Sequence, residues 1–147
     1  MKTKLVIIIS ILLLFTLSTT HADIGLGIIL GEPTGLSCIF ENFIALGLAW
    51  SLENYIHIHV DCWLLHKDLY ESFMWFIGAG GKLKIFTELS NRQEQDTSFA
   101  LGIRIPVGVQ FVFEEHFELF IEAAPGVQLY PATEFDIDAG LGLRFHF

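Results

Sequence analysis

The hydrophobic pattern of residues 135–147 alternates with a period of two. One set of positions is apolar throughout, and the other set is polar or glycine. The apolar set is Phe135, Ile137, Ala139, Leu141, Leu143, Phe145 and Phe147, and the other set is Asp136, Asp138, Gly140, Gly142, Arg144 and His146. Because successive side chains of a strand point to opposite sides, this segment is predicted to be a strand with one apolar face and one polar, small-residue face.

The same alternation recurs along the chain and predicts eight strands. They cover residues 23–31, 36–41, 44–52, 56–64, 73–85, 99–113, 117–129 and 135–147. Tight turns are expected at residues 32–35, around Asn42, and at residues 51–54, 114–116 and 131–133, with a short polar link at 66–71. Residues 87–98 (TELSNRQEQDTS) form the longest polar stretch and are predicted to be a loop. Pro106 and Pro125 fall inside predicted strands, where each removes a ladder hydrogen bond, so we expect a local bulge at each.

The N-terminal residues 1–22 are predicted to be a cleaved secretory signal peptide. Lys2 and Lys4 precede an apolar run, and Thr20-His21-Ala22 places small residues before a cleavage site at Asp23. An uncleaved anchor is the alternative, although the apolar run is short for a spanning helix. A lipoprotein is not expected because no cysteine lies near the cleavage site. The mature domain is therefore expected to cover residues 23–147.

Hydropathy and charge narrow the class of protein. The chain is 52% hydrophobic, yet no apolar run after Ala22 is long enough to span a membrane as a helix. A transmembrane barrel explains this, because its strands alternate lipid-facing apolar and lumen-facing polar residues. After cleavage the formal charge is 6 − 17 = −11, which argues against a nucleic-acid partner. A soluble lipocalin-type barrel, with the apolar face inside, is the alternative fold.

Most charged residues within the predicted strands share the polar face. Lys82, Lys84, Arg104 and Arg144 are expected inside with Glu118, Glu122, Asp136 and Asp138. Arg144 should lie near Glu118 and Glu122, while the other three cations should face Asp136 and Asp138. Eight strands enclose only enough space for side chains, so these ion pairs are predicted to plug the lumen.

Three further candidate sites have simpler explanations. His57, His59 and Asp61 share one strand face at a spacing of two, and we favour lumen-lining side chains over a metal site. Gly78-Ala-Gly-Gly-Lys82 resembles a phosphate loop, but Leu83 stands where Ser or Thr is required. Cys38 and Cys62 lie on strands separated by a third strand, too far apart for a disulfide, and are predicted to be free, buried thiols. No nucleophile and base are paired on the outward face, so an enzyme and a bound cofactor are not expected.

The eight alternating segments, the glycine-rich inner face and the aromatic last strand resemble the small OmpA/OmpX type of outer-membrane barrel. More narrowly, residues 25–37 (GLGIILGEPTGLS) and 104–108 (RIPVG) resemble uncharacterised small barrels of spirochaetes and other diderm bacteria. The resemblance covers residues 23–147. It implies a bacterial outer-membrane location, contact with outer-membrane lipid, and recognition of Phe145 and Phe147 by the outer-membrane assembly machinery. It supplies no catalytic residues.

An even number of strands places both ends of the mature chain in the periplasm. The loop at 87–98 then lies outside the cell, and a set of aromatic residues falls at the periplasmic strand ends, as in an interfacial girdle: Phe40, Phe43, Phe73, Trp75, Phe111, Phe113, Phe117, Phe145 and Phe147. We expect a structural or surface-interaction role, with the loops available to an extracellular or host protein. A narrow solute or ion pore is the first alternative, and a lipid-directed enzyme is the second.

Overall fold

The computed structural model describes residues 23–50, 55–86 and 99–147. The predicted signal peptide (1–22), the turn at 51–54 and the loop at 87–98 lie outside these described residues. The described chain is built from strands, as the alternation predicts, and none of its residues forms a helix long and apolar enough to cross a membrane.

The described residues form nine strands: β1 (Ile24–Glu32), β2 (Thr34–Phe40), β3 (Ile44–Trp50), β4 (Tyr55–Tyr70), β5 (Phe73–Phe86), β6 (Phe99–Arg104), β7 (Val107–Phe113), β8 (Phe117–Tyr130) and β9 (Glu134–His146). All pairings between them are antiparallel. β6 and β7 both pair with β5 on one side and with β8 on the other, so they are consecutive parts of the sixth predicted strand.

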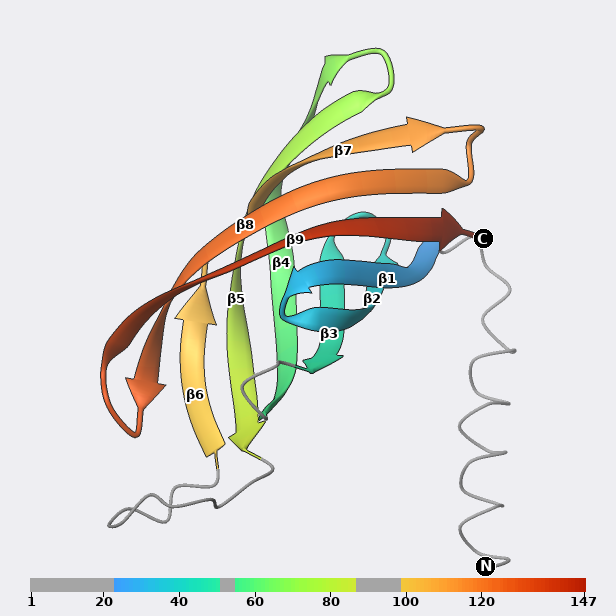
Figure 1. Ribbon diagram of the computed structural model, residues 1–147. Helices are drawn as coiled ribbons and strands as arrows, with labels where there is room; N and C mark the ends of the chain where they lie inside the picture. Colours follow the sequence, from blue (N-terminus) through green and yellow to red (C-terminus); the bar gives the residue numbers. More distant parts are fainter. Residues whose placement is uncertain (1–22, 51–54, 87–98) are drawn as a thin grey trace, which may run out of the picture.

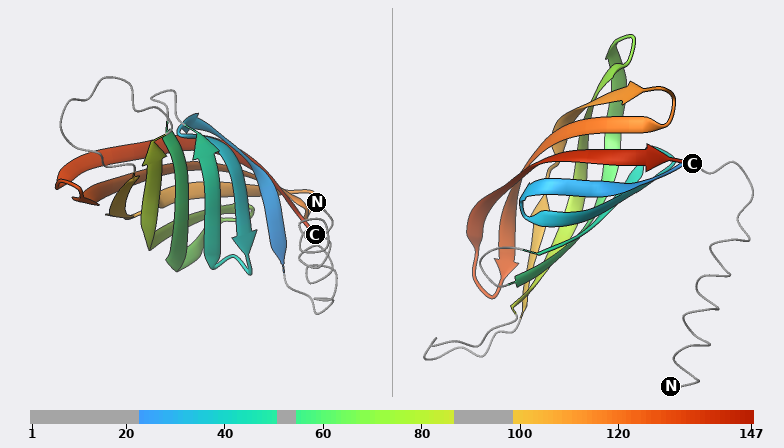
Figure 2. Two further views of the ribbon diagram at one scale, coloured as in Figure 1. Left: turned by 90° about the horizontal axis from the view of Figure 1, so that it is seen from below. Right: turned by 45° about the vertical axis from the view of Figure 1, so that its right-hand side comes forward.

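The pairings form a continuous circuit around the molecule. They run from β1 through β2, β3, β4 and β5 to the β6–β7 pair, then through β8 and β9 back to β1. Figures 1 and 2 show the resulting curled sheet, which surrounds an enclosed face and turns its other face outward. A sheet that pairs in this way has few unpaired edges, which are otherwise sites of aggregation.

Alternating burial separates the two faces as the sequence predicts. On β9, Phe135 and Ile137 on the outer face are 69% and 59% exposed, while Asp138 and Arg144 on the enclosed face are 6% and 2% exposed. The outer face of the other strands is equally apolar, with Leu30, Leu36 and Trp50 more than half exposed. The side-chain period of two therefore places the charges inside and the large apolar side chains outside.

The expected polar link at residues 66–71 is wrong, because β4 continues as a strand to Tyr70. Residues 65–70 pair with residues 73–77 of β5, and register shifts occur between Trp63 and Leu65 and between Asp68 and Tyr70. These two irregularities interrupt the alternation of inward and outward side chains. The sequence of this segment therefore lacks the period of two that identifies the other strands. Leu64, Leu65, Leu69 and Tyr70 nevertheless keep this hairpin apolar and exposed.

The expected bulges at the two prolines are also wrong. The pairing register is unchanged across Pro106 and across Pro125, although strand structure is interrupted at residues 105–106. Pro125 accepts a hydrogen bond from the Ile105 amide (2.9 Å) but has no N–H to return one. Each proline thus removes a ladder bond without displacing its neighbours.

The two rims of the sheet each contain one large step. At one rim β1 ends with Glu32 opposite Ala139, whereas β9 extends further to Glu134. At the other rim the β3–β4 pairing ends near Trp63, whereas β4 extends further to Tyr70. Both longer hairpins project beyond their neighbours in Figure 1.

Candidate functional site

The enclosed face contains two clusters of charged side chains separated by a layer of aromatic side chains. The order is visible along β8, where Glu118, Phe120 and Glu122 are buried at successive inward positions. We name the three groups by their members. The terminal cluster, next to both ends of the strand circuit, is Asp23, Ser37, Glu118, Arg144 and His146; the aromatic layer is Trp63, Phe76 and Phe120; the distal cluster is Asp61, Lys82, Lys84, Arg104, Glu122, Asp136 and Asp138.

The terminal cluster is a connected network centred on Glu118, which is fully buried. Arg144 Nη1 donates to Glu118 Oε1 (2.6 Å), and His146 Nε2 lies 2.6 Å from Glu118 Oε2. Arg144 also donates through Nε to Ser37 Oγ (3.0 Å). His146 Nδ1 lies 2.7 Å from Asp23, the residue that precedes β1, so the network joins the start of the described chain to β2, β8 and β9. Charge-assisted bonds of this kind are stronger than neutral ones, and here they bridge the β1–β9 seam.

The aromatic layer packs directly against the terminal cluster. Trp63 and Phe76 stack nearly in parallel, with ring centroids 3.9 Å apart. The Arg144 guanidinium lies 3.8 Å from the centre of the Phe120 ring and 5.6 Å from that of Trp63. All three aromatic side chains are buried. A cation over aromatic faces in a dry site gains both electrostatic attraction and apolar contact.

Glycines on neighbouring strands provide the space for these rings. A Cβ atom at Gly142 would overlap the Phe120 ring, and one at Gly108 would overlap the Phe76 ring. The same holds in the distal half, where a Cβ at Gly47 would overlap the His59 ring. The glycine-rich inner face is therefore a packing requirement of the large side chains opposite it.

The distal cluster shares carboxylates among several cations. Asp136 contacts both Lys82 and Lys84, the latter at 2.8 Å, and Asp138 lies 3.2 Å from Lys82. Arg104 contacts Glu122 and lies 3.4 Å from Asp138. Lys82 and Lys84 come from β5 and the aspartates from β9, so these ion pairs cross the enclosed space.

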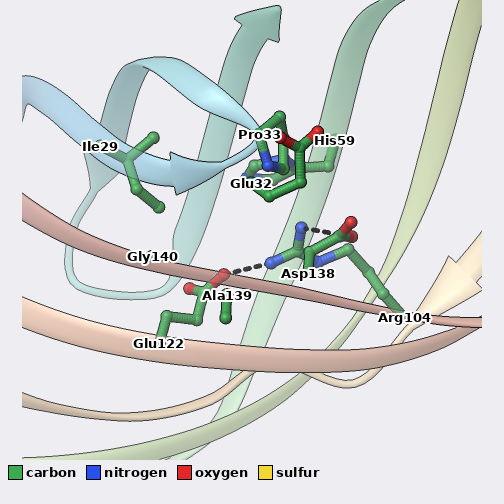
Figure 3. A pocket seen from close by; sticks show the side chains of 9 residues that line it. All are labelled: Ile29, Glu32, Pro33, His59, Arg104, Glu122, Asp138, Ala139 and Gly140. Carbon is green, nitrogen blue, oxygen red and sulfur yellow. Dashed lines mark hydrogen bonds and ion pairs between the residues drawn. The ribbon is translucent and has the colours of Figure 1, made fainter. Parts of the chain in front are cut away.

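Part of the distal half contains buried polar atoms without hydrogen bonds to the described residues. Arg104 Nε is 3.3 Å from Asp61 Oδ1 but not in hydrogen-bond geometry, and neither ring nitrogen of His57 has a partner. A cavity of about 10 Å³ lies beside Arg104 and His59, with Glu122 and Asp138 in its wall (Figure 3). That volume holds about one water molecule.

The structure brings the predicted charged residues together with one correction. Arg144 lies beside Glu118 as expected, but its expected contact with Glu122 is wrong, because the aromatic layer separates them and Glu122 contacts Arg104. His57 and His59 meet edge to face at 5.2 Å, and His59 lies 3.8 Å from Asp61. Within residues 23–50, 55–86 and 99–147, no group of three or more His, Cys, Asp or Glu side chains is arranged to hold a metal ion.

The sequence analysis missed Phe76 and Phe120, which close the enclosed space between the two clusters. Their position could have been found from parity, since Phe120 alternates with Glu118 and Glu122, and Phe76 with Gly78. An aromatic residue on an otherwise polar face signals such a layer. On the outer face, Cys38 and Cys62 are free as expected, although they are half-buried and not fully buried.

A ribbon of phenylalanines crosses the outer face near the terminal cluster. Ring contacts with centroids 4.7–5.8 Å apart link them in sequence across four strands: Phe73, Phe111, Phe113, Phe117, Phe145 and Phe147. These residues belong to the predicted aromatic set at one end of the strands. Such ring pairs add to the stabilisation from burial alone.

Comparison with known proteins supports the fold. The structure is similar to the N-terminal β-barrel domain of Pseudomonas aeruginosa OprF, with a TM-score of 0.64, 18% sequence identity, and coverage of 86% of this chain and 96% of that domain. None of the curated proteins matches the chain significantly. The narrower resemblance to spirochaetal barrels stays a prediction. One family model, described as "Protein of unknown function (DUF3996)", matches residues 16–147, and the chain therefore belongs to this family.

Proposed function

We propose that the protein is an integral outer-membrane barrel of eight transmembrane strands whose lumen is plugged by its own side chains. Its role is structural or surface-interacting, and its loops offer contacts to extracellular or host proteins. It is exported through the signal peptide at residues 1–22, inserted by the outer-membrane assembly machinery, and has no enzymatic activity. The similarity to the OprF barrel domain supports the architecture, and the distribution of charged side chains supports the membrane location and the plugged lumen.

The distribution of charge over the two faces carries this proposal. Among the described residues, exposed Asp, Glu, Lys and Arg side chains occur only in turns, at strand ends or in the β4 extension: Glu32, Glu41, Lys67, Asp68, Glu71, Glu114, Glu115 and Glu134. The outer wall between these positions is apolar, while the enclosed face contains both ion-pair clusters. A soluble barrel would have the opposite arrangement, and lipid is the solvent that favours this one.

The filling of the enclosed space supports a plug in place of a pore. Arg104 and Arg144 are each 2% exposed and contact carboxylates from other strands, while Trp63, Phe76 and Phe120 occupy the level between the clusters. The cavity near Arg104 accommodates about one water molecule and no solute. If such a buried pair separated, each partner would be left as an uncompensated charge. This cost keeps the ion pairs formed and the lumen filled.

Electrical recording of the refolded protein in planar bilayers tests the plug. We expect no steady conductance, together with detergent-dependent extraction and heat-modifiable gel mobility for the folded barrel. Reproducible open-channel currents that change in Arg104 or Lys82 variants would instead make the protein a narrow pore. Solubility without detergent would favour the lipocalin-type alternative.

Orientation can be tested on intact cells. A tag inserted near Gln95, in the predicted outer loop, should be reached by antibody, while a tag at Glu115 should not. The opposite pattern would invert the proposed topology. The loop itself lies outside the described residues, so this proposal rests on strand parity and on the length of the polar segment.

We assign the assembly signal to Phe145 and Phe147 at the end of the outer-face ribbon. Deleting Phe147, which is 73% exposed, should sharply reduce insertion in cells. Phe135→Ala is the matched control, because Phe135 is similarly exposed on the same face of β9 at the other rim. Equal insertion of the deletion and the control would contradict the assignment.

A further inference from the structure

The ring of His146, the last residue of β9, lies between two carboxylates. Its Nε2 atom is 2.6 Å from Glu118 Oε2, and its Nδ1 atom is 2.7 Å from Asp23 Oδ1. A neutral imidazole has a single N–H, so one of its nitrogens would turn a lone pair toward a carboxylate oxygen. Both contacts are hydrogen bonds only when both ring nitrogens carry a proton. The geometry therefore fits the imidazolium cation.

The other bonds of the two acidic residues leave the extra proton on the ring. Glu118 takes part as a carboxylate, because its Oε1 atom forms an ion pair with Arg144 Nη1 (2.6 Å). The Asp23 side chain is 44% exposed, and its second oxygen accepts a hydrogen bond from Asn42 Nδ2 (2.8 Å). Negative charge on both sides of one imidazole stabilises the charged form of the ring.

The charge on His146 lies where the first and last strands close the circuit. Phe147 N–H, next to His146, donates to Ile24 O of β1 (3.0 Å), and the Asp23 side chain bonds to the ring one residue earlier in β1's direction. Gly25 leaves room for the ring, since a Cβ there would lie 2.9 Å from His146 Cε1. The contact between His146 and Asp23 therefore ties the start of β1 to the end of β9.

Other charged and titratable groups act on the ring or on its partners from several elements. They are Glu41 of the β2–β3 turn, Cys38 of β2, His66 and Asp68 of β4, His116 of the β7–β8 turn, Glu118 of β8 and Arg144 of β9. Among these, His66 interacts electrostatically with Glu118, and the exposed His116 ring stacks on Phe145. Both histidines therefore need control variants in any test of pH dependence.

We propose that His146 is a proton-binding latch on the β1–β9 seam: folding takes up one proton, and the charged ring then joins Asp23 to Glu118. A histidine in the unfolded chain has lost most of this proton above about pH 7, whereas the two carboxylates retain it in the folded protein. The stability contributed by the latch is therefore complete at mildly acidic pH and is lost as the pH rises and the folded ring deprotonates. This inference does not depend on the proposed membrane location.

Nitrogen NMR of the full-length mature protein, labelled at histidine and refolded in detergent, tests the protonation directly. At about pH 7.5, both ring nitrogens of His146 should give the signals of protonated nitrogen, while the histidines of the urea-unfolded protein should give the neutral pattern. His146→Gln removes one set of signals and so assigns it. A folded His146 ring with a single N–H at this pH would refute the latch.

The pH dependence of unfolding tests whether the proton stabilises the fold. Urea titrations from about pH 6.5 to 8.5 give the folding equilibrium constants of the wild type and of His146→Gln. The ratio of the two constants should fall by about threefold or more as the pH rises, and one proton limits the change to about tenfold per pH unit. Groups present in both proteins, Cys38 and His66 included, cancel in this ratio. A ratio that does not change with pH would contradict the inference.

Further variants separate the charge of the ring from its packing. His146→Lys carries a charge that does not titrate in this range, so it should lose the pH dependence and be more stable than His146→Gln at about pH 8.5. Asp23→Asn changes only a half-exposed side chain, so it keeps the test available if His146→Gln does not fold, and it should reduce the pH dependence. His66→Gln and His116→Gln should retain it. Wild-type pH dependence in Asp23→Asn, or its loss in His116→Gln, would overturn the assignment to His146.

Discussion

The two charged clusters fill the same enclosed space in different ways. In the terminal cluster, Glu118 has a separate partner at each carboxylate oxygen, and Arg144 is packed against an aromatic ring. In the distal cluster, Asp136 and Asp138 are each shared by two cations, and nearby polar atoms lack hydrogen bonds to the described residues. In the terminal cluster each residue has a partner that no other residue can replace. In the distal cluster a carboxylate that loses one cation still contacts another. Stability should therefore be concentrated near the chain ends, and tolerance to substitution in the distal half.

The largest expected effect comes from the terminal cluster. Arg144→Ala would leave the buried Oε1 atom of Glu118 without its partner and remove the contact with Phe120, so the free energy of unfolding should fall by roughly 3–5 kcal/mol. Urea titration of the refolded protein in detergent, followed by gel mobility, measures this loss. Combining Arg144→Met with Glu118→Gln should restore part of the stability, because no unpaired charge remains. A loss no greater than that of a distal variant would contradict the comparison.

The aromatic layer should tolerate added volume poorly. Gly142→Val would place a side chain where the Phe120 ring lies, and overpacking of this kind lowers stability by about 1–3 kcal/mol. Gly81→Val is the matched control, since a Cβ there approaches only Gly102 O, at 3.9 Å. Thermal unfolding of both variants in the same detergent compares them. Equal destabilisation would show that the layer is looser than its contacts indicate.

A single cation of the distal cluster should matter less. Lys84→Met removes one partner of Asp136, but Lys82 remains in contact with the same carboxylate. We expect a loss of about 1 kcal/mol or less in the urea titration, because Lys84 is only half-buried and its charge is partly screened by solvent. If Lys84→Met destabilised the protein as much as Arg144→Ala, the distal cluster would not have the redundancy inferred here.

The smallest expected effect has the opposite sign. His57 is fully buried, and neither ring nitrogen forms a hydrogen bond with the described residues. His57→Leu should therefore be neutral or raise stability by up to about 1 kcal/mol, since it removes unsatisfied polar atoms and keeps apolar volume. His59→Leu, which also loses the 3.8 Å contact between His59 Nε2 and Asp61 Oδ2, serves as the comparison in the same thermal assay. A clear loss for His57→Leu would indicate that a bound water molecule satisfies the ring.

The sequence predicted the faces better than the contacts. Alternation placed Lys82, Arg104 and Arg144 inside because strand parity is independent of tertiary detail. It missed the length of β4, where two register shifts hide the period, and it assigned bulges to Pro106 and Pro125 that the neighbouring strands do not need. Which residues on the enclosed face contact one another depends on their level along the barrel axis. The alternation of side chains gives only the face on which a residue lies and not its level. That is why Glu122 was paired with Arg144 although Phe120 lies between them in level.

Because four of the five basic side chains in the described residues lie on the enclosed face, this part of the folded chain offers few cleavage sites to trypsin. Residues 23–147 contain six Lys and Arg residues: Lys67, Lys82, Lys84, Arg92, Arg104 and Arg144. Of those in the described chain, only Lys67 is exposed, at the projecting β4–β5 hairpin, while Lys82, Arg104 and Arg144 are buried and Lys84 is half-buried. The unfolded chain presents all six to the enzyme. Limited digestion with trypsin therefore distinguishes assembled from unassembled protein, because the peptide bonds after the buried Lys and Arg residues are protected only in the folded protein.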